Sequence, residues 1–137
     1  MCIDSSTKVV LAASERLRRL EHVEVMEGDM QALPFDRPQF DLVLLMHALT
    51  YAEKPALALA EAARVLRKGG RLLLTCLARP EHSAAVTPYR HVNLGFTDKE
   101  LRRFAAKAGM NVDFCQTVTQ ERRPPHFEVL ALLAHKQ

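Results

Sequence analysis

The sequence predicts an α/β protein built around an open, mostly parallel sheet. The segment 40–46 (FDLVLLM) is apolar on both strand faces, which is typical of a strand in the middle of a parallel sheet covered by helices. A helix is predicted over residues 55–66, and a second apolar strand over residues 71–77. Together these segments form a strand, a crossover helix and a neighbouring parallel strand, a unit that is right-handed by the usual rule.

The predicted helix over residues 55–66 has a start, a face and a stop. Pro55 lies in the first turn, where a missing N–H is tolerated, and Gly69 and Gly70 follow the last turn. The apolar residues that share one face are Leu59, Ala62, Ala63 and Leu66.

The segment before this unit is interpreted as strand, helix and strand. Residues 1–4 are the end of a strand, and Ser5 or Ser6 can cap the helix that follows, whose apolar residues recur at Val10, Ala13, Leu17 and Leu20. Residues 22–26 form a short strand that the turn Gly28-Asp29-Met30 closes.

The C-terminal part predicts a helix and a hairpin. Thr97 and Glu100 form a T-x-x-E capping box at the start of a helix that Gly109 ends. Two strands are expected over residues 110–118 and 127–134. Pro124 and Pro125 keep the link between them from extending either strand.

Composition narrows the class of protein. The chain of 137 residues is expected to form one domain over residues 1–137, short for a complete doubly wound enzyme, and it is 48% hydrophobic and 26% charged. Its net charge of +3 comes from scattered basic residues, so a direct nucleic-acid interface is not expected. No signal peptide and no apolar run that could span a bilayer is seen.

The cysteines and histidines indicate a cytoplasmic protein without a metal site. The three cysteines, Cys2, Cys76 and Cys115, show no C-x-x-C spacing, and the last two lie in apolar strands as small buried side chains. The six histidines show no metal-ligand spacing with cysteines or carboxylates.

Three segments carry a resemblance to a known family: GDMQALPF (28–35), FDLVLLMHALTY (40–51) and EAARVLRKGGRLLLT (61–75). In this order and spacing they resemble motifs of class I S-adenosylmethionine-dependent methyltransferases, particularly the small-molecule type related to ubiquinone-biosynthesis methylases. The segment 91–110 also resembles methyltransferase domains fused to winged-helix repressors of the arsenical-resistance type. The resemblance implies a Rossmann-like methyltransferase sheet with a C-terminal antiparallel hairpin.

The resemblance also implies S-adenosylmethionine as cofactor and names residues that bind it. Asp4 matches the acidic residue that accepts hydrogen bonds from the ribose hydroxyls, and Asp29 matches the one that accepts from the adenine amino group. Met30 matches the position that meets the adenine ring, and Met46 is placed in the same cofactor site. The alternative for Asp4 is a carboxylate favoured by the dipole of the following helix.

Substrate contacts are expected beyond the carboxyl end of the strand 40–46, where open α/β sheets place their chemistry. His47 is the candidate general base, with solvated pocket lining as the alternative, and Tyr51 is a candidate substrate contact. The irregular segment 78–96 is either a lid or a long crossover, and its candidate substrate contacts are Tyr89, Arg90 and His91.

The family's first strand and glycine-rich turn are absent, since no G-x-G occurs. That strand belongs between the segments ending at Asp4 and beginning at Phe40, so two unpaired strand edges are expected. Three explanations stay open: the chain begins at an internal methionine of a longer protein, the sheet closes by pairing differently, or a second copy supplies the strand. The expected function is methyl transfer to a small molecule. The alternative is a non-catalytic, N-terminally truncated module that acts by homodimerisation or in a regulator.

Overall fold

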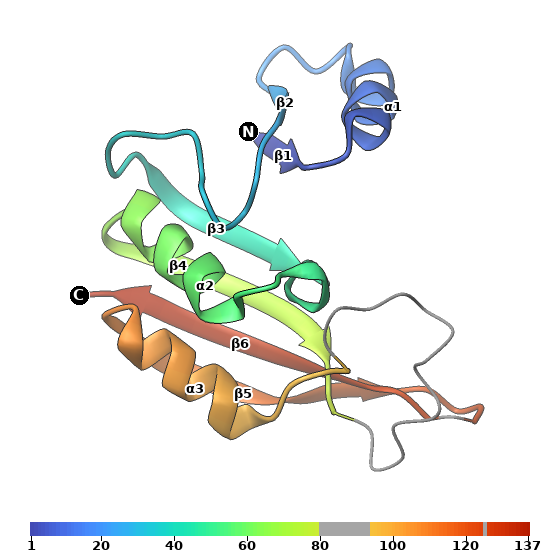
Figure 1. Ribbon diagram of the computed structural model, residues 1–137, viewed down its shortest axis with the longest axis vertical. Coiled ribbons are helices and arrows are strands. Elements are labelled where there is room, and N and C mark those ends of the chain that lie inside the picture. The colour runs from blue at the N-terminus through green and yellow to red at the C-terminus, as the bar shows by residue number, and fades with distance from the viewer. Residues whose placement is uncertain (80–93, 125) are drawn as a thin grey trace.

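The computed structural model describes residues 1–79, 94–124 and 126–137 (Figure 1). In chain order, its helices and strands are β1 (Cys2–Asp4), α1 (Thr7–Leu17), β2 (Val25–Glu27), β3 (Phe40–Met46), the 3-10 helix η1 (Leu49–Tyr51), α2 (Pro55–Val65), β4 (Leu66–Leu77), α3 (Asp98–Lys107), β5 (Met110–Gln120) and β6 (Glu128–Lys136). The strand 40–46 is thus confirmed residue for residue, whereas β2 begins later than predicted.

The strands form two separate sheets. β1 and β2 pair in parallel as a two-stranded sheet, and the other four strands follow the order β3-β4-β6-β5. β3 and β4 are parallel, and β6 runs antiparallel to both β4 and β5. The predicted crossover unit and the predicted antiparallel C-terminal hairpin are therefore both confirmed.

The core lies between the four-stranded sheet and one layer of helices. Figure 1 shows α2 and α3 on the same face of this sheet, and on β4 the side chains of Leu72, Leu74 and Cys76 alternate toward that core with 0% exposure. α3 begins at the predicted capping box, since Thr97 Oγ1 accepts from Glu100 N and the Glu100 carboxylate accepts from Thr97 N. The helix layer thus supports one face of the sheet, including that of β3.

The environment of β3 differs from the prediction of a strand buried in mid-sheet. β3 is the edge strand of its sheet, and Leu42, Leu44 and Met46 expose 49%, 54% and 54% of their surface. Their face carries neither α2 nor α3, and α1 packs beside β1 and β2 instead. An apolar pattern shows which residues of a strand can be buried, but it does not show whether a neighbour covers them. Within the described residues, no strand pairs with the outer edge of β3.

The unpaired edges expected from the missing first strand are present. β1 pairs only with β2 in the described part of the chain and makes no ladder with β3. The explanation in which the sheet closes by pairing differently is therefore wrong for this structure. The space between β1 and β3 remains open, and it is the place where the predicted site residues gather.

Candidate functional site

A cavity of about 920 Å³ lies between the β1–β2 pair and the open edge of β3. Its lining comes from β1, from the turn and loop after β2, from β3 and the chain that follows it, and from one face of α2. Small-molecule sites typically occupy about 300–1,000 Å³ and are mostly apolar with a few polar groups. The cavity is therefore large enough for a nucleoside-sized ligand and carries polar groups at its rim.

The acidic turn after β2 is held against the end of β1. Gly28 N donates to Asp4 O at 3.0 Å, which extends the parallel pairing by one step. The approach is close, since a Cβ on Gly28 would lie 2.9 Å from Ile3 Cγ2. Glycine at this position therefore brings the next residue, Asp29, up beside the end of β1.

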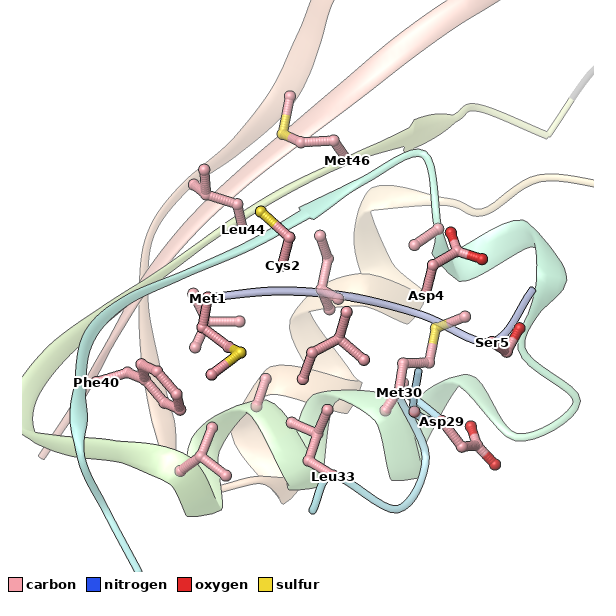
Figure 2. A pocket seen from close by; sticks show the side chains of 18 of the residues that line it. Met1, Cys2, Asp4, Ser5, Asp29, Met30, Leu33, Phe40, Leu44 and Met46 are labelled. Carbon is pink, nitrogen blue, oxygen red and sulfur yellow. The ribbon is translucent and has the colours of Figure 1, made fainter. Parts of the chain in front are cut away.

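Both predicted cofactor carboxylates lie at the lining of this cavity. Figure 2 shows Asp4 and Asp29 at the same end of it, with the Met30 side chain between them. Asp4 Oδ1 accepts from Ser6 N at 2.8 Å, and Asp29 Oδ1 accepts from Gln31 N at 2.8 Å. Two fixed acceptors beside an apolar thioether suit a ligand that combines hydroxyl or amino donors with a flat ring.

The floor of the cavity is apolar. The rings of Phe35 and Phe40 meet edge to face, with centroids 4.9 Å apart, and Val43 and Leu45 of β3 lie beside them. α2 contributes alanines, among them Ala62, which is 1% exposed. Because these alanines carry only a methyl group, the helix leaves room above its surface.

A further part of the lining follows the carboxyl end of β3. His47 N donates to Thr75 O at 2.8 Å, so β3 and β4 stay paired up to this point, and His47 then adopts φ of 54°. A left-handed conformation is unusual for a residue other than glycine, and such residues concentrate at functional sites. Thr50 Oγ1 donates to His47 O at 3.1 Å, which supports the turn.

The structure brings most of the predicted site residues to this one cavity. Its lining includes Asp4, Asp29, Met30, Met46, His47 and Tyr51. Their roles stay predictions, and the contact of Asp4 with Ser6 N also fits the alternative of a carboxylate at a helix start. The predicted substrate contacts Tyr89, Arg90 and His91 lie outside the described residues.

Sequence reasoning missed a polar network that joins α2 to the loop after the acidic turn. Glu61 Oε2 accepts from Leu33 N at 2.7 Å, and Arg64 donates from Nη2 to Leu33 O at 3.0 Å and from Nη1 to Phe35 O. The Arg64 guanidinium holds the pKa of the Glu61 carboxyl below its usual value, with the Leu33 N–H acting in the same direction. The available signal was the Glu-Arg pair at i,i+3 in EAAR.

Two other chemistries find no support in the described residues. Burial raises the pKa of the Cys76 thiol to about 12 and that of Cys115 to about 11, so both are protonated near neutral pH and are poor nucleophiles. No group of three His, Cys, Asp or Glu side chains is arranged to hold a metal ion in residues 1–79, 94–124 and 126–137. Over the same ranges, no helix combines the length and apolarity needed to cross a membrane.

Comparison with known proteins identifies the family. The model of the methyltransferase domain matches residues 1–74, which is more than half of the chain. The chain belongs to this methyltransferase family. The match ends within β4, so it covers every described residue that lines the cavity.

Curated relatives are longer than this chain. It is 34% identical over 132 residues to an uncharacterized 37.1 kDa protein in transposon Tn4556 of Streptomyces fradiae, which covers 85% of this chain and 37% of that protein. It is 28% identical over 135 residues to a demethylmenaquinone methyltransferase of Mycobacterium tuberculosis, which covers 98% of this chain and 54% of that enzyme. The chain thus spans about half, or less, of the length of these relatives.

Solved structures share the fold. The [4+2]-cyclase SpnF superposes with a TM-score of 0.83 at 20% identity, covering 98% of this chain and 64% of that one. An S-adenosylmethionine-dependent methyltransferase from Methanosarcina mazei gives a TM-score of 0.78 at 18% identity, covering 98% and 80%. These likenesses establish a Rossmann-like methyltransferase fold for the chain and leave its reaction to the site.

Proposed function

We propose that this chain binds S-adenosylmethionine at the end of the cavity where β1 and β3 finish, beyond the gap in which the family's first strand is expected, and serves methyl transfer to a small-molecule acceptor. The observation that carries the proposal is the gathering of Asp4, Asp29 and Met30 at one end of a cavity that His47 and Tyr51 also line. Family membership supports the cofactor, and the relatives named demethylmenaquinone methyltransferase support a small-molecule acceptor.

The residues present fit the cofactor's polar and flat parts. In this proposal the Asp4 carboxylate accepts from a pair of vicinal hydroxyls and the Asp29 carboxylate from an exocyclic amino group, and both residues line the cavity. Met30 and the apolar floor offer a surface for a ring system. S-adenosylmethionine, when bound, supplies a methyl group on a sulfonium that is already activated for transfer.

The chain's remaining task is to place and dehydrate the acceptor. Met46 and Tyr51 border the cavity at the carboxyl end of β3, where an acceptor oxygen, nitrogen, sulfur or carbon is aligned for in-line attack. His47 stands at the same rim, and its neutral imidazole takes the proton when the acceptor is a hydroxyl or an amine.

Thermal shift with S-adenosylhomocysteine tests the proposal on the full chain. A ligand at about a hundred times its Kd stabilises the folded form by about 2.7 kcal/mol, which raises the Tm by about 5–10 °C. Asp29→Ala removes a charged acceptor, so we expect affinity to fall about tenfold to a hundredfold. Asp41→Ala is the matched control, because Asp41 pairs with Arg67 at the amino end of β3 and is 81% exposed.

An unchanged Tm for the wild-type chain over the full ligand range contradicts the proposal. Equal affinities of Asp29→Ala and wild type would remove Asp29 from the site. With binding established, demethylmenaquinone is the first acceptor to assay, since it is the one named in these relatives.

A second candidate function is supported by the exposed edge of β3. Leu42, Leu44 and Met46 form an apolar strip on a strand whose outer edge has no partner in the described part of the chain, and such edges pair readily with other chains. The candidate is a non-catalytic module that dimerises or forms part of a regulator. It predicts a concentration-dependent homodimer in light scattering and no response to S-adenosylhomocysteine; a monomer with a ligand-dependent Tm contradicts it.

A cytoplasmic location completes the proposal. Cys2, Cys76 and Cys115 are all free thiols, which suits a reducing compartment. Localisation of a tagged chain by fractionation tests this point, and recovery outside the cytoplasm contradicts it.

A further inference from the structure

We infer that Glu61 and Arg64 of α2, together with Gln31, are positioning residues that hold the 29–35 loop at the cavity and thereby set cofactor affinity. The inference rests on the proposed function and deepens it, because the loop begins with Asp29 and Met30. None of the three side chains needs to touch the cofactor for this role.

The loop is fastened to α2 at two places. At one end of the helix, Gln31 Oε1 accepts from Lys54 N at 2.7 Å and so satisfies the backbone N–H of the N-cap residue of α2. About two turns further along the helix, Glu61 accepts a hydrogen bond from the Leu33 N–H, and Arg64 donates one to the Leu33 carbonyl. The loop therefore lies along α2 and has little freedom to shift.

The Glu61–Arg64 pair is itself aligned for this task. Arg64 Nε lies 2.7 Å from Glu61 Oε1, and Arg64 Nη2 lies 2.7 Å from Glu61 Oε2, so the two side chains meet in a fork. The Glu61 side chain is 15% exposed and the Arg64 side chain is 38% exposed. The pair Glu15–Arg18 at the end of α1 has the same spacing but is mostly exposed. Sheltered, forked pairs are directional, whereas exposed pairs contribute little.

The fold explains why such a fastening matters here. The acidic turn follows β2, which belongs to the two-stranded sheet, whereas His47 follows β3 in the other sheet. No strand pairing joins the two sheets in the described part of the chain, so backbone ladders do not fix the turn relative to His47. α2 is packed on the sheet that carries His47, and its side chains reach across to the loop. Without them, the ligand would have to order the loop as it binds.

The test compares Glu61→Ala and Glu61→Gln with a matched control, Glu100→Ala, in the full chain. Glu100 likewise accepts from a backbone N–H, that of Thr97, and from an arginine, Arg79, and it is 26% exposed on α3 away from the cavity. Amide hydrogen exchange at Leu33 reports the loop, and titration calorimetry with S-adenosylhomocysteine reports affinity.

We expect Glu61→Ala to speed exchange at the Leu33 amide and to weaken S-adenosylhomocysteine binding about tenfold, since a few backbone residues must then be ordered on binding. Glu61→Gln should lie between Glu61→Ala and wild type, because its amide oxygen still accepts from Leu33 N. Glu100→Ala should lower the Tm and leave the affinity within about twofold.

The outcomes separate the two claims. Wild-type binding with an equal affinity for Glu61→Ala, or an equal loss in Glu100→Ala, overturns the positioning role and leaves the proposed function intact. If the wild-type chain does not bind S-adenosylhomocysteine, the proposed function is wrong. In that case, faster exchange at Leu33 would make Glu61 a purely structural residue, which also overturns the positioning role.

Discussion

The two carboxylates of the cavity are held by the same local device. Asp4 accepts from the N–H of Ser6 and Asp29 from that of Gln31, in each case two residues further along the chain. This is the turn that aspartate side chains favour after a strand. Each carboxylate is thus oriented before any ligand arrives, and a pre-oriented acceptor loses less entropy on binding. Both residues were predicted from the sequence through the resemblance to family motifs, and their roles stay predictions.

Glu61 predicts a specific pH dependence of stability. Its pKa in the folded chain lies below the ordinary 4.5 because Arg64 hydrogen-bonds to the carboxylate. Burial opposes this lowering, and the Leu33 N–H adds to it. Asp36 acts on the charge of Arg64. A lowered carboxyl pKa gives stability that is present above the unfolded value and is lost as pH falls through the folded value. The difference in Tm between wild type and Glu61→Gln should therefore be constant above about pH 5 and shrink below it.

Comparing the two proteins at each pH isolates Glu61. Glu100 also has a lowered pKa, so the wild-type Tm alone would mix the two groups, whereas both proteins keep Glu100. A Tm difference that grows as the pH falls below about 4 would contradict this account.

The backbone of His47 gives a second residue-scale prediction. A left-handed conformation costs a residue with a Cβ about 1–2 kcal/mol, and glycine avoids most of this cost. We expect His47→Gly to raise the free energy of unfolding in urea by about 1 kcal/mol. A loss of more than about 1 kcal/mol would show that the imidazole holds the turn through packing. The sequence did not reveal this conformation, because a histidine, unlike a glycine, does not mark a position of positive φ.

At the scale of elements, β3 shows how far a sequence pattern reaches. Its bounds were predictable because six apolar or aromatic residues and one aspartate, over seven positions that follow a proline-containing link, are typical of a strand. Its neighbours were not predictable from the strand itself. A strand in mid-sheet needs a partner at each edge, and burial on both faces needs a helix layer on each face. In the described chain, β3 has one partner strand, β4, and one helix layer.

The two sides of this sheet should respond differently to truncation of a leucine. Leu74 on β4 is fully buried against the helices, so Leu74→Ala should cost about 2–5 kcal/mol in urea unfolding. Leu44 on β3 is 54% exposed, so Leu44→Ala should cost less than about 1 kcal/mol in the monomer. A cost at Leu44 close to that at Leu74 would mean that the face is covered in solution, as in a homodimer.

For the whole molecule, the sequence predicted the order of elements and six of the residues that line the cavity, each at or soon after the end of a strand. It did not reveal how the β1–β2 pair sits against β3, since no backbone ladder connects them. The connection runs through Glu61, Arg64 and Gln31. The spacing of Glu61 and Arg64 is equally typical of a solvated helix face, so it did not mark this contact. The cavity therefore depends on side-chain contacts that a pattern of apolar residues does not encode.

The most direct test of the central claim is a nuclear magnetic resonance titration of the full chain with S-adenosylhomocysteine, following backbone amide shifts. We predict saturable shifts at Gly28, Asp29 and Met30 and at His47, which also lines the cavity, with little change at Glu121 and Arg122 beyond β5. Amides that stay in place across the titration, or shifts confined to residues outside the cavity, would contradict a cofactor site at the end of the cavity where β1 and β3 finish.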